Sequence, residues 1–267
     1  MKPNFLVIGA PRSGTTWIAR NLMQHPEVFI PRAKETHYFD RHYDSGMSHY
    51  ETYFEPVESE LAIGEATPDY LACEPCAGRI KQDLGTVKLI VSLRNPVDRL
   101  YSRYWNTEGR VSKRTGRSFE ERIGEVPSWV SEGFYDDHLE RYFSLFPKSD
   151  VLVLLYDVLK SNPEKFFQDI VRFIGVNERM IPESVSHRMN AAGAKPLNGK
   201  SMMLYATHRV ARRLNLEKLS SRLDAMNQNS LPVMRSDTRK RLVADVYGRH
   251  IENLEKLLDV DLSSWRS

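Results

Sequence analysis

The segment GAPRSGTTW at residues 9–17 has the residue types and spacing of a phosphate-binding loop. It follows an apolar run at residues 5–8 and precedes a pattern typical of a helix. A turn between a strand and a helix directs backbone N–H groups at one point, where the helix dipole adds partial positive charge. Gly9 and Gly14 permit a tight turn, and the two threonines that follow add hydroxyl donors. The sequence therefore predicts a site for a phosphate or a related oxyanion.

The cation of this loop distinguishes it from the loop of a nucleoside triphosphatase. The glycine spacing matches the G-x-x-x-x-G of a Walker A motif, but position 15 is Thr where that motif has Lys. The positive charge comes instead from Arg12, inside the turn. This difference argues against ATP or GTP hydrolysis and favours another phosphate-bearing ligand. A glycine turn without a ligand is the alternative that the loop alone leaves open.

A second segment, VSLRNPVDRLYSRYW at residues 91–105, contains a further pair of phosphate-binding side chains. Arg94 ends a predicted strand, and Ser102 lies about two turns into the predicted helix that follows. Arginine can contact a phosphate through two N–H groups, and serine can add a hydroxyl donor. The pair predicts a second phosphate site, with an ordinary surface Arg and Ser as the alternative.

A third segment, PRAKETHYFD at residues 31–40, offers a general base. Transfer of a group to a hydroxyl or amine requires a base near the nucleophile and cations near the leaving oxygen. Glu35 is the first candidate base, and His37 is the second. The alternatives are a loop carboxylate in an ion pair and a histidine that packs beside aromatic residues.

These segments resemble those of sulfotransferases that use 3′-phosphoadenosine 5′-phosphosulfate (PAPS). The chain is identified as a bacterial-type member, similar in its motifs to the heparan sulfate N- and 3-O-sulfotransferase branch. The resemblance implies PAPS as co-substrate, no metal, and catalytic roles for Glu35 and Arg12, with His37 as the alternative base. The PAPS-binding residues that it implies are Pro11, Arg12, Ser13, Gly14, Thr15, Thr16, Trp17, Arg94, Ser102 and Lys195.

The segment GEATPDYL at residues 64–71 departs from the family pattern, E-K-T-P-x-Y, because Ala66 stands where the family has Lys. Either Arg12 supplies most of the charge stabilisation on the leaving group, or another cation replaces the missing one. Glu65 and Tyr70 are expected to contact the acceptor. In the family a late basic loop closes over the nucleotide; Lys195 and Lys200 are candidates for that contact here, and solvated loop lysines are the alternative.

Length and composition indicate an ordinary globular protein. The chain has 267 residues, of which 41% are hydrophobic and 27% charged, and we expect one sulfotransferase domain over residues 1–267. A net charge of +3 is too small to require nucleic acid or a membrane surface as partner. No apolar run approaches the ~20 residues of a membrane helix or forms a signal peptide, so the expected location is cytoplasmic.

The chain has two cysteines, Cys73 and Cys76, in the spacing C-x-x-C. This spacing is found in redox pairs and in half of a zinc site, but zinc needs about four ligands and the sequence has no second pair. We expect two reduced thiols without a functional role.

Five apolar runs predict strands, and helical periodicity separates them. The predicted strands are Phe5–Ala10, Val28–Pro31, Leu61–Ala66, Val87–Arg94 and Val151–Tyr156. The segment 161–164 predicts a capping box with Ser161 at the N-cap, opening a helix that ends at Gly175. The alternation predicts a three-layer α/β fold: a parallel sheet flanked by helices, with a P-loop-like strand-loop-helix. Ligands of such sheets bind at the carboxyl ends of the strands.

The predicted reaction is transfer of a sulfuryl group from PAPS to a hydroxyl or amine of an acceptor, a carbohydrate or a natural product. The alternatives are a nucleotide-binding module without transfer activity and a small-molecule kinase. The missing Lys at position 15 argues against the kinase, and Glu35 beside two phosphate segments argues against the inert module. No motif specifies the acceptor, O- or N-sulfation, or the oligomeric state.

Overall fold

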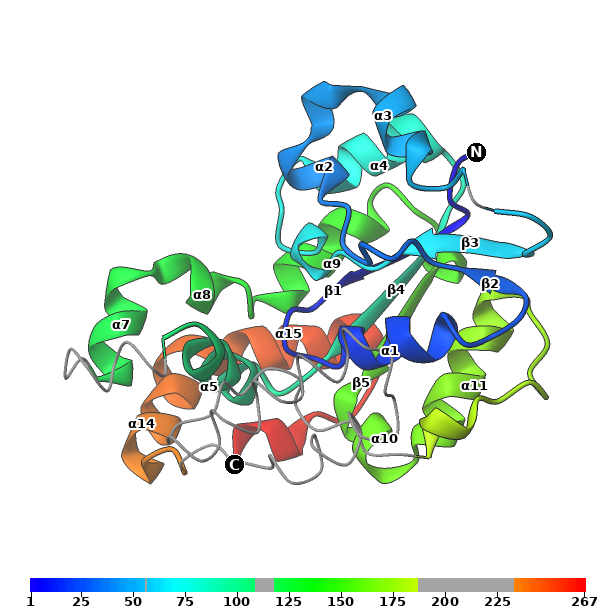
Figure 1. The fold of residues 1–267 in the computed structure, drawn as a ribbon. Coiled ribbons are helices and arrows are strands. Elements are labelled where there is room, and N and C mark those ends of the chain that lie inside the picture. Colours follow the sequence, from blue (N-terminus) through cyan, green and yellow to red (C-terminus); the bar gives the residue numbers. More distant parts are fainter. Residues whose placement is uncertain (56, 109–117, 187–232) are drawn as a thin grey trace, which may run out of the picture.

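The fold is built on a parallel sheet with strand order β2-β3-β1-β4-β5 (Figure 1). The structure is a computed structural model that describes residues 1–55, 57–108, 118–186 and 233–267. Its strands are β1 (Phe5–Gly9), β2 (Val28–Phe29), β3 (Ala62–Glu65), β4 (Lys88–Leu93) and β5 (Val151–Leu155). All five predicted strands are confirmed, with one or two residues fewer at an end.

Helices follow the strands and cover both faces of the sheet (Figure 1). The α-helices are α1 (Thr15–Leu22), α2 (Tyr38–Arg41), α3 (Met47–Thr52), α4 (Cys76–Leu84), α5 (Pro96–Thr107), α7 (Phe119–Glu125), α8 (Pro127–Ser131), α9 (Tyr135–Phe143), α10 (Tyr156–Ser161), α11 (Pro163–Ile174), α14 (Ser236–Arg241) and α15 (Gly248–Leu258). The π-helical turn η5 (Leu242–Tyr247) joins α14 to α15. The 3₁₀ turns are η1 (Tyr43–Ser45), η2 (Pro68–Tyr70), η3 (Lys148–Asp150), η4 (Glu183–Val185) and η6 (Ser263–Arg266).

The central strand β1 is apolar throughout because it is buried on both faces. Side chains of a strand alternate between the two faces. Leu6 and Ile8 enter the core shared with α4, α9 and α15, whereas Phe5 and Val7 enter the core shared with α1 and α11. All four side chains are fully buried. This three-layer arrangement confirms the predicted fold class.

The topology brings distant segments of the sequence to one edge of the sheet. Strand β1 lies between β3 and β4, and all pairings are parallel. The loops after β1, β2, β3 and β4 therefore leave the sheet at the same edge. The chain leaves β1 toward β2 and β3 on one side and later adds β4 and β5 on the other, which makes the end of β1 a switch point.

Helix α11 begins one residue later than the predicted capping box requires. Asn162 is its N-cap, and the Asn162 side chain accepts a hydrogen bond from the Lys165 backbone N–H at 3.0 Å. Ser161 instead donates its hydroxyl to the Asp157 carbonyl at 3.0 Å, within α10. The prediction of Ser161 as cap is wrong because α10 continues through that residue. The predicted end at Gly175 is confirmed, with φ of 84°.

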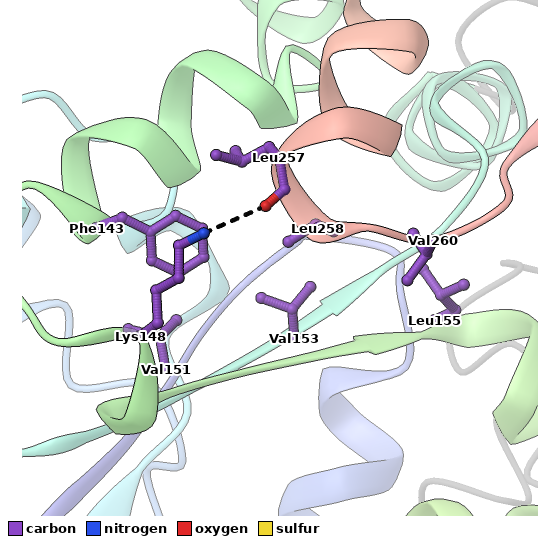
Figure 2. A pocket seen from close by; sticks show the side chains of 8 residues that line it. All are labelled: Phe143, Lys148, Val151, Val153, Leu155, Leu257, Leu258 and Val260. Carbon is purple, nitrogen blue, oxygen red and sulfur yellow. Dashed lines mark hydrogen bonds between the residues drawn. The ribbon is translucent and has the colours of Figure 1, made fainter.

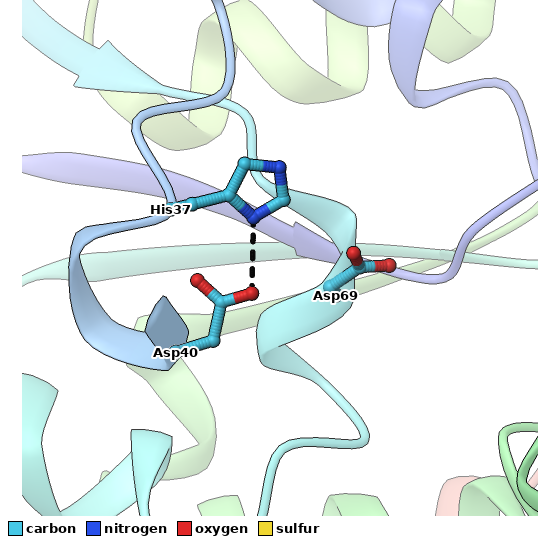
Figure 3. A group of neighbouring side chains, drawn as sticks. All are labelled: His37, Asp40 and Asp69. Carbon is cyan, nitrogen blue, oxygen red and sulfur yellow. Dashed lines mark hydrogen bonds and ion pairs between the residues drawn. The ribbon is translucent and has the colours of Figure 1, made fainter. Parts of the chain in front are cut away.

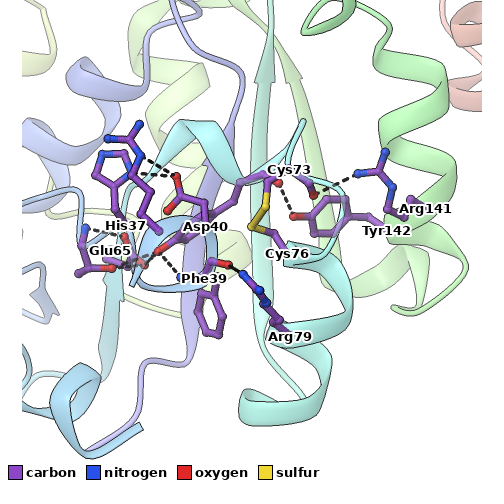
Figure 4. The surroundings of a disulfide bond; sticks show 12 residues. His37, Phe39, Asp40, Glu65, Cys73, Cys76, Arg79, Arg141 and Tyr142 are labelled. Carbon is purple, nitrogen blue, oxygen red and sulfur yellow. Dashed lines mark hydrogen bonds and ion pairs between the residues drawn. A yellow bond between two sulfur atoms is a disulfide. The ribbon is translucent and has the colours of Figure 1, made fainter. Parts of the chain in front are cut away.

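Cys73 and Cys76 form a disulfide, so the prediction of two reduced thiols is wrong (Figure 4). Cys76 is the first residue of α4, and its backbone N–H donates to the Cys73 carbonyl at 3.3 Å. This turn places the two Cα atoms 5.4 Å apart, a separation that suits a disulfide. Helix α9 packs against the same segment: Arg141 donates to the Cys73 carbonyl and Tyr142 to the Tyr70 carbonyl.

A pocket of about 230 Å³ lies beside the outer strand β5, between α9 and the end of α15 (Figure 2). Its lining is apolar apart from Lys148, which donates to the Leu257 carbonyl at 3.5 Å. None of the predicted site residues lines this pocket. Within the ranges that the structure describes, no helix is long and apolar enough to cross a membrane.

Candidate active site

The loop between β1 and α1 has the backbone geometry of an oxyanion cradle. Gly14 precedes α1 with φ of 90°, and a Cβ atom there would lie 2.8 Å from Leu159. Both the backbone conformation and the available space therefore require glycine. No side chain caps α1, so the amides of its first turn are left to a ligand or water. Ser92 on β4 fixes the loop by donating its hydroxyl to the Ser13 carbonyl at 2.6 Å.

The remaining predicted loop residues differ in what they expose to this cradle. Pro11, Ser13 and Thr15 are buried, whereas Thr16 is half-buried. Trp17 points away from the cradle and packs edge-on against Phe166 of α11, with ring centroids 5.8 Å apart. Only the backbone N–H of Trp17 can therefore serve a ligand of the loop.

The structure brings the two predicted phosphate segments into direct contact. The Arg12 Nε donates to the Ser102 hydroxyl at 3.1 Å, and Arg94 donates to the Arg12 carbonyl at 3.4 Å. The Arg94 guanidinium also lies over the ring of Tyr156, 5.2 Å from its centroid. Ser102 is buried on α5, so its hydroxyl faces the loop rather than solvent.

This contact gathers positive charge around Arg12. Burial is the main cause that lowers the pKa of Arg12 to about 10, followed by the charges of Arg94 and Arg103. The Nε of Arg94 is buried and has no hydrogen-bond partner in the part of the chain that the structure describes. Half-buried cations that repel one another and a buried donor without a partner are costly in the absence of an anion. The positive charge and the unpartnered donor therefore fit an anionic ligand such as a phosphate.

Glu35 lies beside the loop and is held by two neighbours. Its Oε1 is 2.6 Å from the Lys34 Nζ, and its Oε2 is 3.6 Å from the His37 Nε2. Lys34 also donates to the Thr16 hydroxyl at 3.3 Å, which connects the candidate base to the phosphate loop. The side chain of Glu35 is 37% exposed, so an acceptor can reach it.

His37 is oriented by Asp40, a residue that the sequence analysis missed (Figure 3). The His37 Nδ1 lies 3.0 Å from Asp40 Oδ2. In the neutral tautomer in which Nδ1–H donates to Asp40, the Nε2 lone pair is on the side of Glu35. His37 is the N-cap of the short helix α2, and Asp40 lies three residues later within it; that spacing was the available signal.

His37, Asp40 and Asp69 could also hold a cation, because their ligand atoms lie within 4.8 Å of one another. Arg41 competes for that role. Its guanidinium lies 3.5 Å from Asp40 and 2.8 Å from Asp69, so the carboxylates already have a positive partner.

Glu65 is a buried anchor, and the prediction that Glu65 and Tyr70 contact the acceptor is wrong. Both side chains are fully buried. Glu65 accepts hydrogen bonds from Thr36 at 2.9 Å, from Tyr70 at 2.8 Å and from Tyr50 at 3.2 Å. Burial raises the pKa of Glu65, and hydrogen bonds from Thr67, Tyr70 and Thr36 oppose that effect. Because Thr36 lies between Glu35 and His37, the network fixes the segment that carries both candidate bases.

Residues with a left-handed backbone conformation are concentrated in this site. Of the described residues other than glycine, four have positive φ: Arg12 (69°), Lys34 (58°), His37 (51°) and Asp259 (54°). The first three lie around the loop and Glu35. Such backbone strain persists where the surrounding structure fixes it, and it is common at functional sites. Lys195 and Lys200 lie outside the described residues.

Comparison of the sequence with known proteins identifies its family. A family model described as the sulfotransferase domain matches residues 2–209. The chain belongs to this sulfotransferase family.

Three relatives illustrate the match. Heparan sulfate glucosamine 3-O-sulfotransferase 6 of Mus musculus is 32% identical over 183 residues, which cover 65% of this chain and 52% of that protein. The bifunctional heparan sulfate N-deacetylase/N-sulfotransferase 3 of Homo sapiens is 29% identical over 195 residues, covering 65% of this chain and 22% of that protein.

The third relative, the membrane-associated sulfotransferase kil1 of Dictyostelium discoideum, is 41% identical over 105 residues, 38% of this chain and 22% of that protein. The matches thus span about half or less of these relatives. A solved sulfotransferase from Alicyclobacillus acidocaldarius is 26% identical and superimposes with a TM-score of 0.74 over the full length of both chains. The family and the fold predicted from the sequence are confirmed.

Proposed function

We propose that this sulfotransferase-family chain transfers a sulfuryl group from PAPS to a hydroxyl or amine of an acceptor. The observation that carries the proposal is the hydrogen bond between Arg12 and Ser102, which joins the two segments predicted to bind phosphate. Lys34 connects the first of these segments to Glu35. A nucleotide with separate 5′ and 3′ phosphates would use both segments. A nucleoside triphosphate has a single chain of phosphates at the 5′ position and would need only one of them. Family membership supports the same conclusion.

In this proposal different residues bind the two ends of PAPS. Arg12, the loop amides and the hydroxyls of Thr15 and Thr16 would bind the 5′-phosphosulfate. Arg94 and Ser102 would bind the 3′ phosphate through charge-assisted hydrogen bonds. Pro11 and Ser13 would shape the loop, and Gly14 and Trp17 would present their backbone N–H groups. The proposed contact of Lys195 lies outside the described residues.

The proposed chemistry needs one base and a cluster of cations. PAPS, when bound, supplies an activated sulfuryl group and a bisphosphate leaving group. Glu35 accepts the acceptor's proton on a carboxylate oxygen, and Arg12 stabilises charge on the departing oxygen. His37, oriented by Asp40, is the alternative base. In this proposal guanidinium and N–H groups provide the neutralisation that Mg²⁺ provides in kinases.

The acceptor class is a carbohydrate or a natural product in this proposal. Two of the relatives are named as heparan sulfate sulfotransferases, which favours a sugar hydroxyl or amine. Ala66 departs from the family segment, so the acceptor need not be that of the relatives. The cytoplasmic location stays a prediction, and the Cys73–Cys76 disulfide weighs against it because disulfides are rare in reducing compartments.

Calorimetry with 3′-phosphoadenosine 5′-phosphate (PAP), 5′-AMP and ATP plus Mg²⁺ tests the proposal. PAP should bind more tightly than 5′-AMP, and Arg94→Ala should remove most of that preference, roughly 10–150-fold for a charged hydrogen-bonded contact. Arg172→Ala, which removes an exposed cation on α11, is the matched control and should leave the preference intact. Equal affinity for PAP and 5′-AMP in the unmodified protein would contradict the assignment, and preference for ATP plus Mg²⁺ would favour a kinase. Labelled PAPS with a panel of glycans, phenols and lipids then identifies the acceptor.

A further inference from the structure

Lys34 lies at the junction of the phosphate loop and the candidate base. Its Nζ is 3.3 Å from the Thr16 hydroxyl and 2.6 Å from Glu35 Oε1, and its side chain is 15% exposed. Lysine side chains are usually solvated, so this enclosed position between an anion and a phosphate-binding hydroxyl requires a reason.

The backbone holds Lys34 in that position. The Ala66 N–H donates to the Lys34 carbonyl at 2.9 Å, and the Lys34 N–H donates to the Pro31 carbonyl at 2.8 Å. Its φ of 58° lies in the left-handed region, which an unbranched cationic residue adopts rarely. Lys34 therefore lies beside Ala66, the position at which the family has a lysine and this chain has an uncharged side chain.

We propose that Lys34 is a catalytic residue of the sulfuryl transfer, whose ammonium moves from Glu35 to the departing oxygen during the reaction. The inference rests on the proposed function and adds a residue to it. As the acceptor oxygen bonds to sulfur, the bond between sulfur and the bridging oxygen breaks. Its electron pair stays on that oxygen, which becomes a 5′-phosphate oxygen of PAP. The acceptor's proton passes to Glu35, so atoms and charge balance.

The position of Lys34 couples these two events. Before transfer, the Glu35 carboxylate neutralises the Lys34 ammonium across 2.6 Å. When Glu35 takes the proton it becomes neutral, and the ammonium loses its partner as negative charge grows on the oxygen bound at the loop. The Thr16 hydroxyl, 3.3 Å from Nζ, lies on that side of the lysine. An interaction that strengthens only as charge develops lowers the barrier rather than merely tightening binding.

Arg12 is less suited to this exchange. Its Nε is bonded to Ser102, and its guanidinium is crowded by Arg94 and Arg103. In the described ranges, Lys34 is the residue whose side chain is hydrogen-bonded both to the loop and to Glu35.

A double-mutant cycle on PAP binding tests the inference without an acceptor. Glu35→Gln removes the carboxylate charge, as proton transfer does, and should release Lys34 to contact the 5′ phosphate of PAP. We expect Glu35→Gln to tighten PAP binding about 10-fold by calorimetry, within the range of a charged hydrogen bond. In a Lys34→Met background the same change should alter PAP affinity by less than about twofold, because no ammonium is there to be released.

A chemical control separates the charge of Lys34 from its shape. The two native cysteines are joined in a disulfide, so Lys34→Cys introduces a single free thiol. In the Glu35→Gln background, alkylation of that thiol with 2-bromoethylamine should restore the tight PAP binding. Alkylation with 2-bromoethanol, which adds a neutral chain of similar length, should not restore it.

The outcomes distinguish this inference from the proposed function. If the unmodified protein does not bind PAP, both fail. If PAP binds and Glu35→Gln gives no tightening, or the same tightening in the Lys34→Met background, the role of Lys34 is refuted while the PAPS assignment stands. Equal restoration by the amine and the alcohol would also refute it, because a structural role needs no charge.

Discussion

Arg12 and Ser102 are 90 residues apart in the sequence, yet the Arg12 Nε donates to the Ser102 hydroxyl at 3.1 Å. Arg12 belongs to the loop after β1, and Ser102 belongs to α5, which follows β4. Parallel pairing of β1 with β4 brings the two elements to one edge of the sheet. The hydrogen bond therefore links the proposed 5′-phosphate site to the proposed 3′-phosphate site.

Arg12→Ala should lower turnover more than it weakens nucleotide binding. In the proposed site the guanidinium stabilises charge on the leaving oxygen, and removing one such donor costs roughly 10²–10³-fold in kcat. PAP affinity should fall less, because Arg94, Ser102 and the loop amides remain. Comparison of kcat at saturating PAPS with the Kd of PAP gives the two effects. Unchanged turnover at saturating PAPS would contradict the role of Arg12.

Glu35→Gln should reduce transfer to a hydroxyl acceptor by about 10²–10⁴-fold, the usual loss for a general base. Gln keeps the size and hydrogen-bonding reach of Glu but takes no proton, so the change tests basicity. Single-turnover rates with the identified acceptor give the result, and circular dichroism checks the fold.

His37→Ala and Asp40→Asn distinguish the second candidate base. If Glu35 is the base, both variants should lose less activity than Glu35→Gln, because they disturb only its surroundings. Near-full activity of Glu35→Gln together with a collapse in His37→Ala would transfer the role to His37.

The sequence predicted those parts of the site that are contiguous in the chain. The loop at residues 9–16 and the five strands follow from local patterns of glycine and apolar residues, and the structure has both. Arg94 and Ser102 were predicted as a pair because the strand and helix that carry them are adjacent in sequence. Their contact with Arg12 depends on strand order, which local patterns do not specify.

The errors arose where tertiary packing decides. Glu65 is the last residue of strand β3, where a site residue could lie, but its carboxylate is buried and accepts hydrogen bonds from Thr36, Tyr50 and Tyr70. Lys34 was overlooked because its proposed role depends on the hydrogen bond from its side chain to Thr16, a contact that the sequence spacing does not predict. The disulfide depends on the turn that starts α4 at Cys76, and the short C-x-x-C spacing does not by itself settle the oxidation state.

Asp259→Gly should stabilise the fold by roughly 0.5–1 kcal/mol, because glycine adopts the left-handed region without the steric cost of a Cβ. Asp259 is exposed at the C-terminal end of α15, with φ of 54°. Urea unfolding measures the change. Asp245→Gly, the same substitution within the π-helical turn η5, should destabilise instead. Equal effects of the two substitutions would show that the left-handed backbone at Asp259 costs nothing.

His138 should make the fold less stable as the pH falls below neutrality. Burial is the main cause that lowers the pKa of His138 to about 4. Its Nε2 is bonded to the Ser131 carbonyl at 2.9 Å, and its Nδ1 is buried without a hydrogen-bond partner among the described residues. Protonation of the folded state would thus place a charge on an unsatisfied nitrogen.

The sign of the effect follows from proton linkage. An unfolded histidine takes up a proton below a pKa of about 6.5, whereas folded His138 stays neutral down to about pH 4. Between these values the unfolded state binds more protons, so the free energy of unfolding falls with decreasing pH, by up to about 3 kcal/mol at the acid end.

His138→Gln keeps a donor for Ser131 and cannot titrate, so it should flatten this slope. Urea unfolding at several pH values from 7 to 4.5 measures it, with exposed His49→Gln on α3 as the control. Identical slopes for His138→Gln and the unmodified protein would show that His138 does not carry this dependence.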